Sequence, residues 1–158
     1  MLAHISGLRV FARPILLGRR DMSAVLHVPT VKRLGRHVIA EMWDIEQHVL
    51  CSVGLLETIF VDACRESGAT VLHSNFHGFG DGCGVTGVVI LSESHASVHT
   101  WPEYGYAAVD VFMCGTCDPN VAVKAICNRL AEASGKYQVG SESHTFHRGI
   151  LEQIEITH

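Results

Sequence analysis

Hydroxyl, imidazole, carboxylate and thiol side chains lie close together in the stretch LSESHASVHTWPEYGYAAVDVFMCG, residues 91–115. Strand alternation predicts that His95, Ser97 and His99 share one face of a strand. One face of the following strand would carry Ala108, Asp110, Phe112 and Cys114. Because strands hold side chains in fixed geometry, this stretch is a candidate for a chemical site.

Three interpretations of these residues are open. In the first, the histidines and cysteines belong to the core and form hydrogen bonds there. In the second they bind a metal, with possible ligands His77, Cys83, His95, His99 and the Cys114-x-x-Cys117 pair. A single CxxC is weak evidence for zinc, and a thioredoxin-like CxxC would open a helix after the first strand of a βαβ unit. In the third, Ser94 or Ser97 is a nucleophile that acts with His99 and Cys114.

Length and composition limit the class of protein. The chain has 158 residues, which fits one domain, and 47% hydrophobic with 18% charged residues allows a sizeable core. A net charge of -4 gives no basic surface for nucleic acid. No apolar run approaches the roughly 18 residues that a membrane span needs. The six scattered cysteines favour reduced thiols in a cytoplasmic protein.

The first 31 residues differ from the rest in charge. Arg9, Arg13, Arg19 and Arg20 precede the first acidic residue, Asp21. We expect residues 1–31 to form a flexible extension, which is either transit-like or translated from a start codon upstream of Met22. Residues 32–158 are expected to form the single folded domain.

Strands and helices are expected in the order β-α-β-β-β-β-α-β. The strands are predicted at residues 36–43, 70–76, 85–92, 95–101, 106–114 and 137–142, and the helices at 45–67 and 118–133. Gly68 should stop the first helix, and Asp118-Pro119 should start the second. The apolar run at 88–91 predicts a strand buried on both faces. We therefore expect an α+β fold, a two-layer sandwich whose mainly antiparallel sheet has helices on one face. The other face would be free for a substrate or a dimer partner.

The motifs resemble those of one known family. Ser92-Glu93-Ser94-His95, followed by HTWPE at 99–103, GYAA at 105–108 and Cys114-Gly115, is similar to the small prokaryotic type of pyruvoyl-dependent S-adenosylmethionine decarboxylase. The similarity extends to LGRH at 34–37, SGAT at 67–70 and FHGF at 76–79, so it covers roughly residues 34–131. A combination this long and this unusual in composition is improbable by chance.

The resemblance implies a proenzyme that cuts itself between Glu93 and Ser94. Ser94 would become a pyruvoyl group at the start of a chain of residues 94–158, and residues 1–93 would form the other chain. A ketone conjugated to an amide forms a Schiff base with the substrate amine and accepts the electrons released as CO₂ leaves. Strained geometry at the bond would help a neutral serine to attack it.

Family resemblance also implies roles for five further residues. His99 would be the base in processing, and Cys114 would return a proton to the α-carbon after CO₂ loss. Thr86 stands where the family usually has a serine that supports processing. Glu103 would bind the ribose hydroxyls, and Phe79 would stack on the adenine. No metal is expected.

S-adenosylmethionine is the expected substrate, and its decarboxylation would feed spermidine synthesis. The expected assembly is a homodimer of processed protomers, without nucleic acid or membrane as a partner. The turn at residues 80–83 departs from the family's usual form and is one residue longer, so a pyruvoyl-dependent ornithine or arginine decarboxylase stays open. A non-catalytic partner subunit is the second alternative, although Ser94, His99 and Cys114 are all intact.

Overall fold

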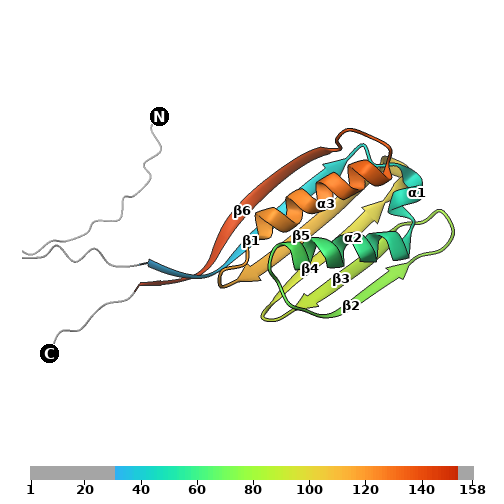
Figure 1. The fold of residues 1–158 in the computed structure, drawn as a ribbon. Coiled ribbons are helices and arrows are strands. Elements are labelled where there is room, and N and C mark those ends of the chain that lie inside the picture. Colours follow the sequence, from blue (N-terminus) through green and yellow to red (C-terminus); the bar gives the residue numbers. More distant parts are fainter. Residues whose placement is uncertain (1–30, 153–158) are drawn as a thin grey trace, which may run out of the picture.

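One antiparallel sheet of six strands forms the first layer of the computed structural model, which describes residues 31–152 (Figure 1). The strands lie in the order β2-β3-β4-β5-β1-β6, and every neighbouring pair is antiparallel. Their bounds are β1 Val31–Trp43, β2 Val71–Gly78, β3 Val85–Leu91, β4 Ser94–Trp101, β5 Tyr106–Cys114 and β6 Gly140–Glu152.

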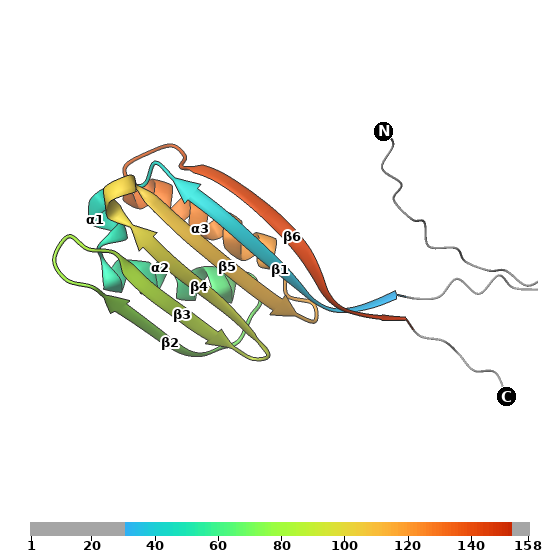
Figure 2. The same cartoon turned by 180° about the vertical axis from the view of Figure 1, so that it is seen from behind.

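Helices form the second layer on one face of this sheet. They are α1 Gln47–Leu50, α2 Val53–Glu66 and α3 Pro119–Ala133, and a short 3-10 turn, η1, spans Pro102–Tyr104. Figure 2 shows the other face of the sheet, which carries no helix of the described range and is called the open face below. The expected two-layer α+β sandwich is confirmed.

The core lies between the sheet and the helices. Alternate residues of β5 point inward, and Ala107, Val109, Val111 and Met113 are at most 2% exposed. They share one core cluster with Leu56 and Phe60 of α2 and with Ile126 and Leu130 of α3. The helix-facing sides of the strands and the apolar stripes of the helices therefore bury one another, which is the main stabilising term of the fold.

The helix signals in the sequence correspond to real helix ends. After α2, Gly68 adopts a φ of +86°, which glycine tolerates readily. Asp118 caps α3 by accepting a hydrogen bond from the Asn120 amide at 3.0 Å, and Pro119 occupies the first turn. The hydrogen bond from the Asn120 amide, together with the guanidinium of Arg36, holds the pKa of Asp118 below its usual value.

The bounds predicted for the first helix and for the last strand were wrong. The helix expected at 45–67 is divided into α1 and α2, because the chain turns after Leu50, whose carbonyl accepts a hydrogen bond from Thr100 at 2.8 Å. The last strand is not 137–142 but Gly140–Glu152, because it pairs with β1 along that strand's whole length. Its polar residues gave no strand signal beyond position 142.

The expectation of burial on both faces of β3 is also wrong for a single chain. Val89 and Leu91 face the helices and are buried, whereas Ile90 on the open face is 44% exposed. The apolar run at 88–91 is therefore only half covered by this chain. The apolar side chains of the open face are therefore available for contact with a second chain.

The expected N-terminal extension falls almost entirely on residues 1–30, which lie outside the described range. Residue 31 already begins β1, five positions before the predicted start of that strand. Across residues 31–152, the helices are all too short or too polar to cross a bilayer.

Replacing Phe60 with alanine tests the core. Phe60 is fully buried, and its ring centroid lies 6.1 Å from that of Phe76. We expect Phe60→Ala to lower the free energy of unfolding by about 3–5 kcal/mol in urea denaturation, because it leaves a cavity. The control is Tyr137→Ala, where the side chain is fully exposed and a change within about 0.5 kcal/mol is expected. Similar losses in both variants would contradict the assignment of the core.

Candidate active site

The tight turn between β3 and β4 contains the bond between Glu93 and Ser94. Leu91 pairs with Ser94, so only Ser92 and Glu93 make the turn. Glu93 has a φ of +61°, in the left-handed region. A residue with a side chain adopts this region at a cost of about 1–2 kcal/mol. Backbone strain is therefore located directly before Ser94.

Ser94 lies beside Cys114, the last residue of β5. The Cys114 amide donates a hydrogen bond to the Ser94 hydroxyl oxygen at 3.0 Å. Both residues line a pocket of about 600 Å³. The other lining residues are Leu34, His37, Glu93, His95, Phe112, Arg148 and Gly149. The structure thus brings together four residues selected from the sequence, namely Glu93, Ser94, His95 and Cys114.

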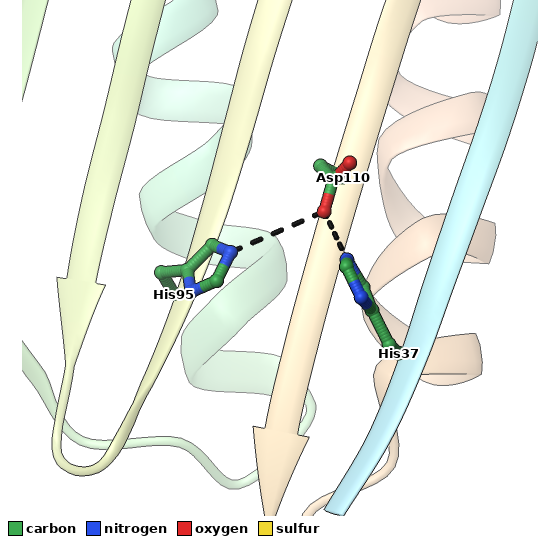
Figure 3. A group of neighbouring side chains, drawn as sticks. All are labelled: His37, His95 and Asp110. Atoms are coloured by element: carbon green, nitrogen blue, oxygen red, sulfur yellow. Dashed lines mark hydrogen bonds and ion pairs between the residues drawn. The ribbon is translucent and has the colours of Figure 1, made fainter. Parts of the chain in front are cut away.

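Two histidines and a carboxylate lie together on the open face beside this pocket (Figure 3). His37 on β1 is hydrogen-bonded through Nε2 to Asp110 Oδ1 on β5. His95 on β4 directs its Nε2 toward the same oxygen at 4.0 Å. Phe112 is the register partner of both histidines, and its ring centroid lies 5.8 Å from that of His37 and 5.9 Å from that of His95.

Arg148 extends this group from β6. Its Nη1 lies 3.2 Å from Nδ1 of His37. A guanidinium can only donate, so Nδ1 of His37 accepts and the ring proton sits on Nε2, where it is donated to Asp110. Arg148, His37 and Asp110 therefore form a continuous hydrogen-bonded chain along one side of the pocket.

His99 lies in a different part of the open face. Its Nδ1 is 3.0 Å from the hydroxyl oxygen of Thr86, its register partner on β3. Along β4, His99 comes five residues after Ser94, which corresponds to about 16 Å at roughly 3.3 Å per residue. Within one chain, His99 and Thr86 therefore do not reach the Ser94 hydroxyl.

Phe79 and Glu103 belong to the same end of the molecule as His99. Phe79 follows β2, is 63% exposed and packs edge-on against His77, with ring centroids 5.1 Å apart. Glu103 lies in η1. Its carboxylate lies near Cys51, and the pKa of the Cys51 thiol is raised by burial, by Cys83 and by Glu103. The pocket that contains Ser94 is lined by neither Phe79 nor Glu103.

The ligand set considered for a metal is not assembled. Among residues 31–152, the group of three or more histidine, cysteine or carboxylate ligands that comes together is His37, His95 and Asp110. Only His95 belongs to the set drawn from the sequence. All six cysteines are unpaired, and burial raises the pKa of Cys64 to about 12. Within the described residues, Cys114 and Cys117 form neither a disulfide nor part of a metal-ligand group.

Sequence reasoning missed His37 and Arg148 as pocket residues. His37 was noted only as part of the LGRH motif, and Arg148 lies beyond the predicted last strand. Asp110 was placed on the correct face by strand alternation, but its partners depend on how distant strands pair. Strand order would have been the signal needed to find this group.

Comparison with known proteins shows which family this chain resembles. The model of the family described as S-adenosylmethionine decarboxylase matches residues 36–145. An S-adenosylmethionine decarboxylase proenzyme of Thermosipho melanesiensis is 53% identical over 85 residues, 54% of this chain, and the chain spans 65% of that relative's length. The proenzyme of Bacillus cytotoxicus is 48% identical over 102 residues, covering 64% of this chain and 78% of the relative. A solved adenosylmethionine decarboxylase of Aquifex aeolicus is 31% identical, with a TM-score of 0.62, covering 80% of this chain and 99% of that one.

Proposed function

The chain belongs to the S-adenosylmethionine decarboxylase family, and we propose that it cuts itself between Glu93 and Ser94 and then decarboxylates S-adenosylmethionine. The observation that carries this proposal is the strained turn at Glu93, placed directly before a serine hydroxyl in a pocket with Cys114. Relatives that share half of their matched residues with this chain are named as proenzymes. The products of the cut are residues 1–93 and 94–158.

Self-cleavage begins with attack of the Ser94 hydroxyl oxygen on the Glu93 carbonyl carbon. The amide of Cys114 holds that oxygen at 3.0 Å, which limits the orientations of the side chain. The left-handed backbone at Glu93 raises the energy of the intact turn, so opening the turn releases strain. The Glu93–Ser94 amide bond breaks as the new bond to oxygen forms, so the amide becomes an ester and the hydroxyl proton ends on the freed nitrogen. β-Elimination from Ser94 then cuts the chain after Glu93, and His99 is the base proposed to take the proton from the Ser94 α-carbon in that step. Water then replaces the nitrogen of the Ser94 remnant, which releases ammonia and leaves the ketone.

Residues around position 94 fit a pyruvoyl group made from Ser94. The pocket of about 600 Å³ is roomy enough for a group and a substrate, and the Cys114 amide offers a donor to an oxygen at that position. A pyruvoyl group would supply the electron sink that ordinary side chains lack. Cys114 lines the same pocket, and its thiol is proposed to return a proton to the substrate's α-carbon after CO₂ has left.

Intact mass spectrometry tests the cut. We expect the wild-type protein to give two fragments that meet between Glu93 and Ser94, with the second blocked at its N-terminus. Ser94→Ala removes the attacking oxygen and should leave a single chain. Ser97→Ala is the matched control on the same strand and should be cut normally. An uncut wild-type chain would overturn the proposal and favour the non-catalytic partner subunit.

A homodimer is also proposed, because one chain alone does not bring its site residues together. Ser94 and His99 are separated by about 16 Å on one strand, which is too far for proton transfer. The open face also exposes large apolar side chains, which a partner would cover. These are Ile39, Ile90, Trp101 and Phe146, at 36–49% exposed. Two copies packed through this face with reversed strands would bring His99 and Thr86 of each to Ser94 of the other.

Mixed dimers test this arrangement. We expect Ser94→Ala and His99→Ala each to remain uncut when expressed alone. When the two are co-expressed, the His99→Ala chain should be cut, because its Ser94 meets an intact His99 from the other variant. The measurement is the mass of each chain, distinguished by an affinity tag. Absence of any cleavage in the mixture, with wild-type chains cut under the same conditions, would contradict a shared site.

The substrate proposal depends on Phe79 and Glu103. Both lie at the end of the molecule that carries His99, so the proposed dimer would bring them toward Ser94 of the other copy. An exposed aromatic ring and a carboxylate suit an adenine and a ribose diol. Decarboxylated product would then serve spermidine synthesis, and we propose the cytoplasm as its location.

Release of CO₂ from S-adenosylmethionine, ornithine and arginine, measured side by side on the processed enzyme, tests the substrate. We expect turnover of S-adenosylmethionine, and we expect Glu103→Gln to raise its KM because one acceptor for the ribose hydroxyls is lost. Asp62→Asn, on the exposed side of α2, is the control and should leave KM unchanged. Turnover of ornithine or arginine alone would replace this proposal with the alternative left open by the altered turn at 80–83.

A further inference from the structure

We propose that His95 is the base that accepts a proton from the substrate's primary ammonium group, and that the Asp110 carboxylate, held in place by His37, offsets the positive charge that the His95 ring gains. The inference rests on the proposed function, since a carbonyl group at residue 94 can be attacked only by an uncharged amine. An ammonium nitrogen has no lone pair until it loses a proton. His99 and Cys114 are assigned to other proton transfers, so this proton needs a separate acceptor.

Four other titratable groups line the pocket, and each is less suited to this task. Arg148 stays protonated and has no lone pair to offer. Cys114 is the proposed proton donor for the α-carbon. Glu93 is a carboxylate, which is a weaker base than an imidazole, and after the proposed cut it ends the other fragment. His37 is the remaining group and is excluded by its hydrogen bonds.

Both ring nitrogens of His37 are already engaged. Nδ1 accepts from Arg148 at 3.2 Å, and Nε2 donates to Asp110. The ring is also the less exposed of the two histidines, at 15% against 45% for His95. His37 therefore acts as a fixed donor that holds the Asp110 carboxylate in place.

His95 has the geometry that His37 lacks. Its Nε2 faces Asp110 Oδ1 at 4.0 Å, a distance for charge attraction rather than a direct hydrogen bond (Figure 3). This orientation leaves Nδ1 without a polar contact in the described residues, so that nitrogen is free to face a ligand. The residue also follows Ser94 directly in the chain and lines the same pocket. The Asp110 carboxylate would offset the positive charge that the ring gains with the proton.

The proton balance of this step closes without a further reactant. Nδ1 of His95 takes one proton from the ammonium nitrogen, and the freed lone pair forms the new bond to the carbonyl carbon. Condensation of an amine with a carbonyl releases the carbonyl oxygen as water. His95 gives its proton to that departing oxygen, the amine nitrogen supplies the second proton of the water, and His95 returns to its neutral state.

A metal ion held by His37, His95 and Asp110 is the alternative use of this cluster, because two histidines and a carboxylate are common metal ligands. Metal binding at Nε2 of His37 would move the ring proton to Nδ1. That proton would then face the guanidinium of Arg148, which can only donate. The Arg148 contact therefore favours the hydrogen-bonded arrangement over a metal site.

The test compares two amines that differ in charge. Methylamine is protonated near neutral pH and needs a base, whereas methoxyamine is already uncharged. Each amine is added to the processed enzyme, and its capture is measured as a mass increase of the 94–158 chain. For methylamine, cyanoborohydride is added to reduce the adduct before the mass is measured. We expect His95→Gln to slow methylamine capture by about 100-fold or more. The factor by which it slows methoxyamine capture should be at least ten times smaller. Asp110→Asn should also slow methylamine capture more than methoxyamine capture, but by a smaller factor than His95→Gln does.

Controls separate the possible failures. His48→Gln, on the exposed surface of α1, should capture both amines as the wild type does. If the wild-type enzyme is uncut and captures neither amine, the proposed function fails first. If the wild type is cut but His95→Gln slows both amines equally, or neither, the role of His95 is wrong. If His95→Gln is itself uncut, Asp110→Asn decides by the same criterion. Loss of methylamine capture on chelation, regained with Zn²⁺, would favour the metal instead.

Discussion

The register between β4 and β5 is the constraint on which the site depends. Pairing of His95 with Phe112 brings the Cys114 amide to the Ser94 hydroxyl and leaves Asp110 beside His95. A slip of one residue would turn every side chain of β5 to the opposite face. Asp110 and Cys114 would then point into the helices, and the apolar residues Val109 and Val111 would face outward. Burial of those valines therefore fixes the positions of the reactive groups.

Helices on one face of the sheet have two consequences for the other. They bury the inward-facing apolar side chains of the strands, and they leave the open face without a helix among the described residues. The open face carries reactive groups at two ends, Ser94 at one and His99 at the other, with exposed apolar residues among them. A single sheet face would thus serve both as the dimer interface and as the wall of the site. Under the proposed function, processing and assembly are therefore linked.

The sequence predicted the fold class and most elements, because their signals are local. Asp118-Pro119 at the start of α3 and the buried alternation of β5 are of this kind. The extent of β6 was not predictable in the same way, since it depends on pairing with β1 rather than on its own residues. For the site, the motif located Ser94 and Cys114. The contact between His37 and Arg148 joins positions 111 residues apart in the chain, and only the strand order reveals it.

Strand order also determines what the proposed cut would do to the molecule. Residues 1–93 contain β1, β2 and β3, and residues 94–158 contain β4, β5 and β6. In the sheet, β1 lies between β5 and β6, so strands of the first fragment are interleaved with those of the second. The fragments share three strand pairings, namely β3 with β4, β5 with β1 and β1 with β6. The severed chains are thus interlocked, and neither could leave without unfolding the sheet.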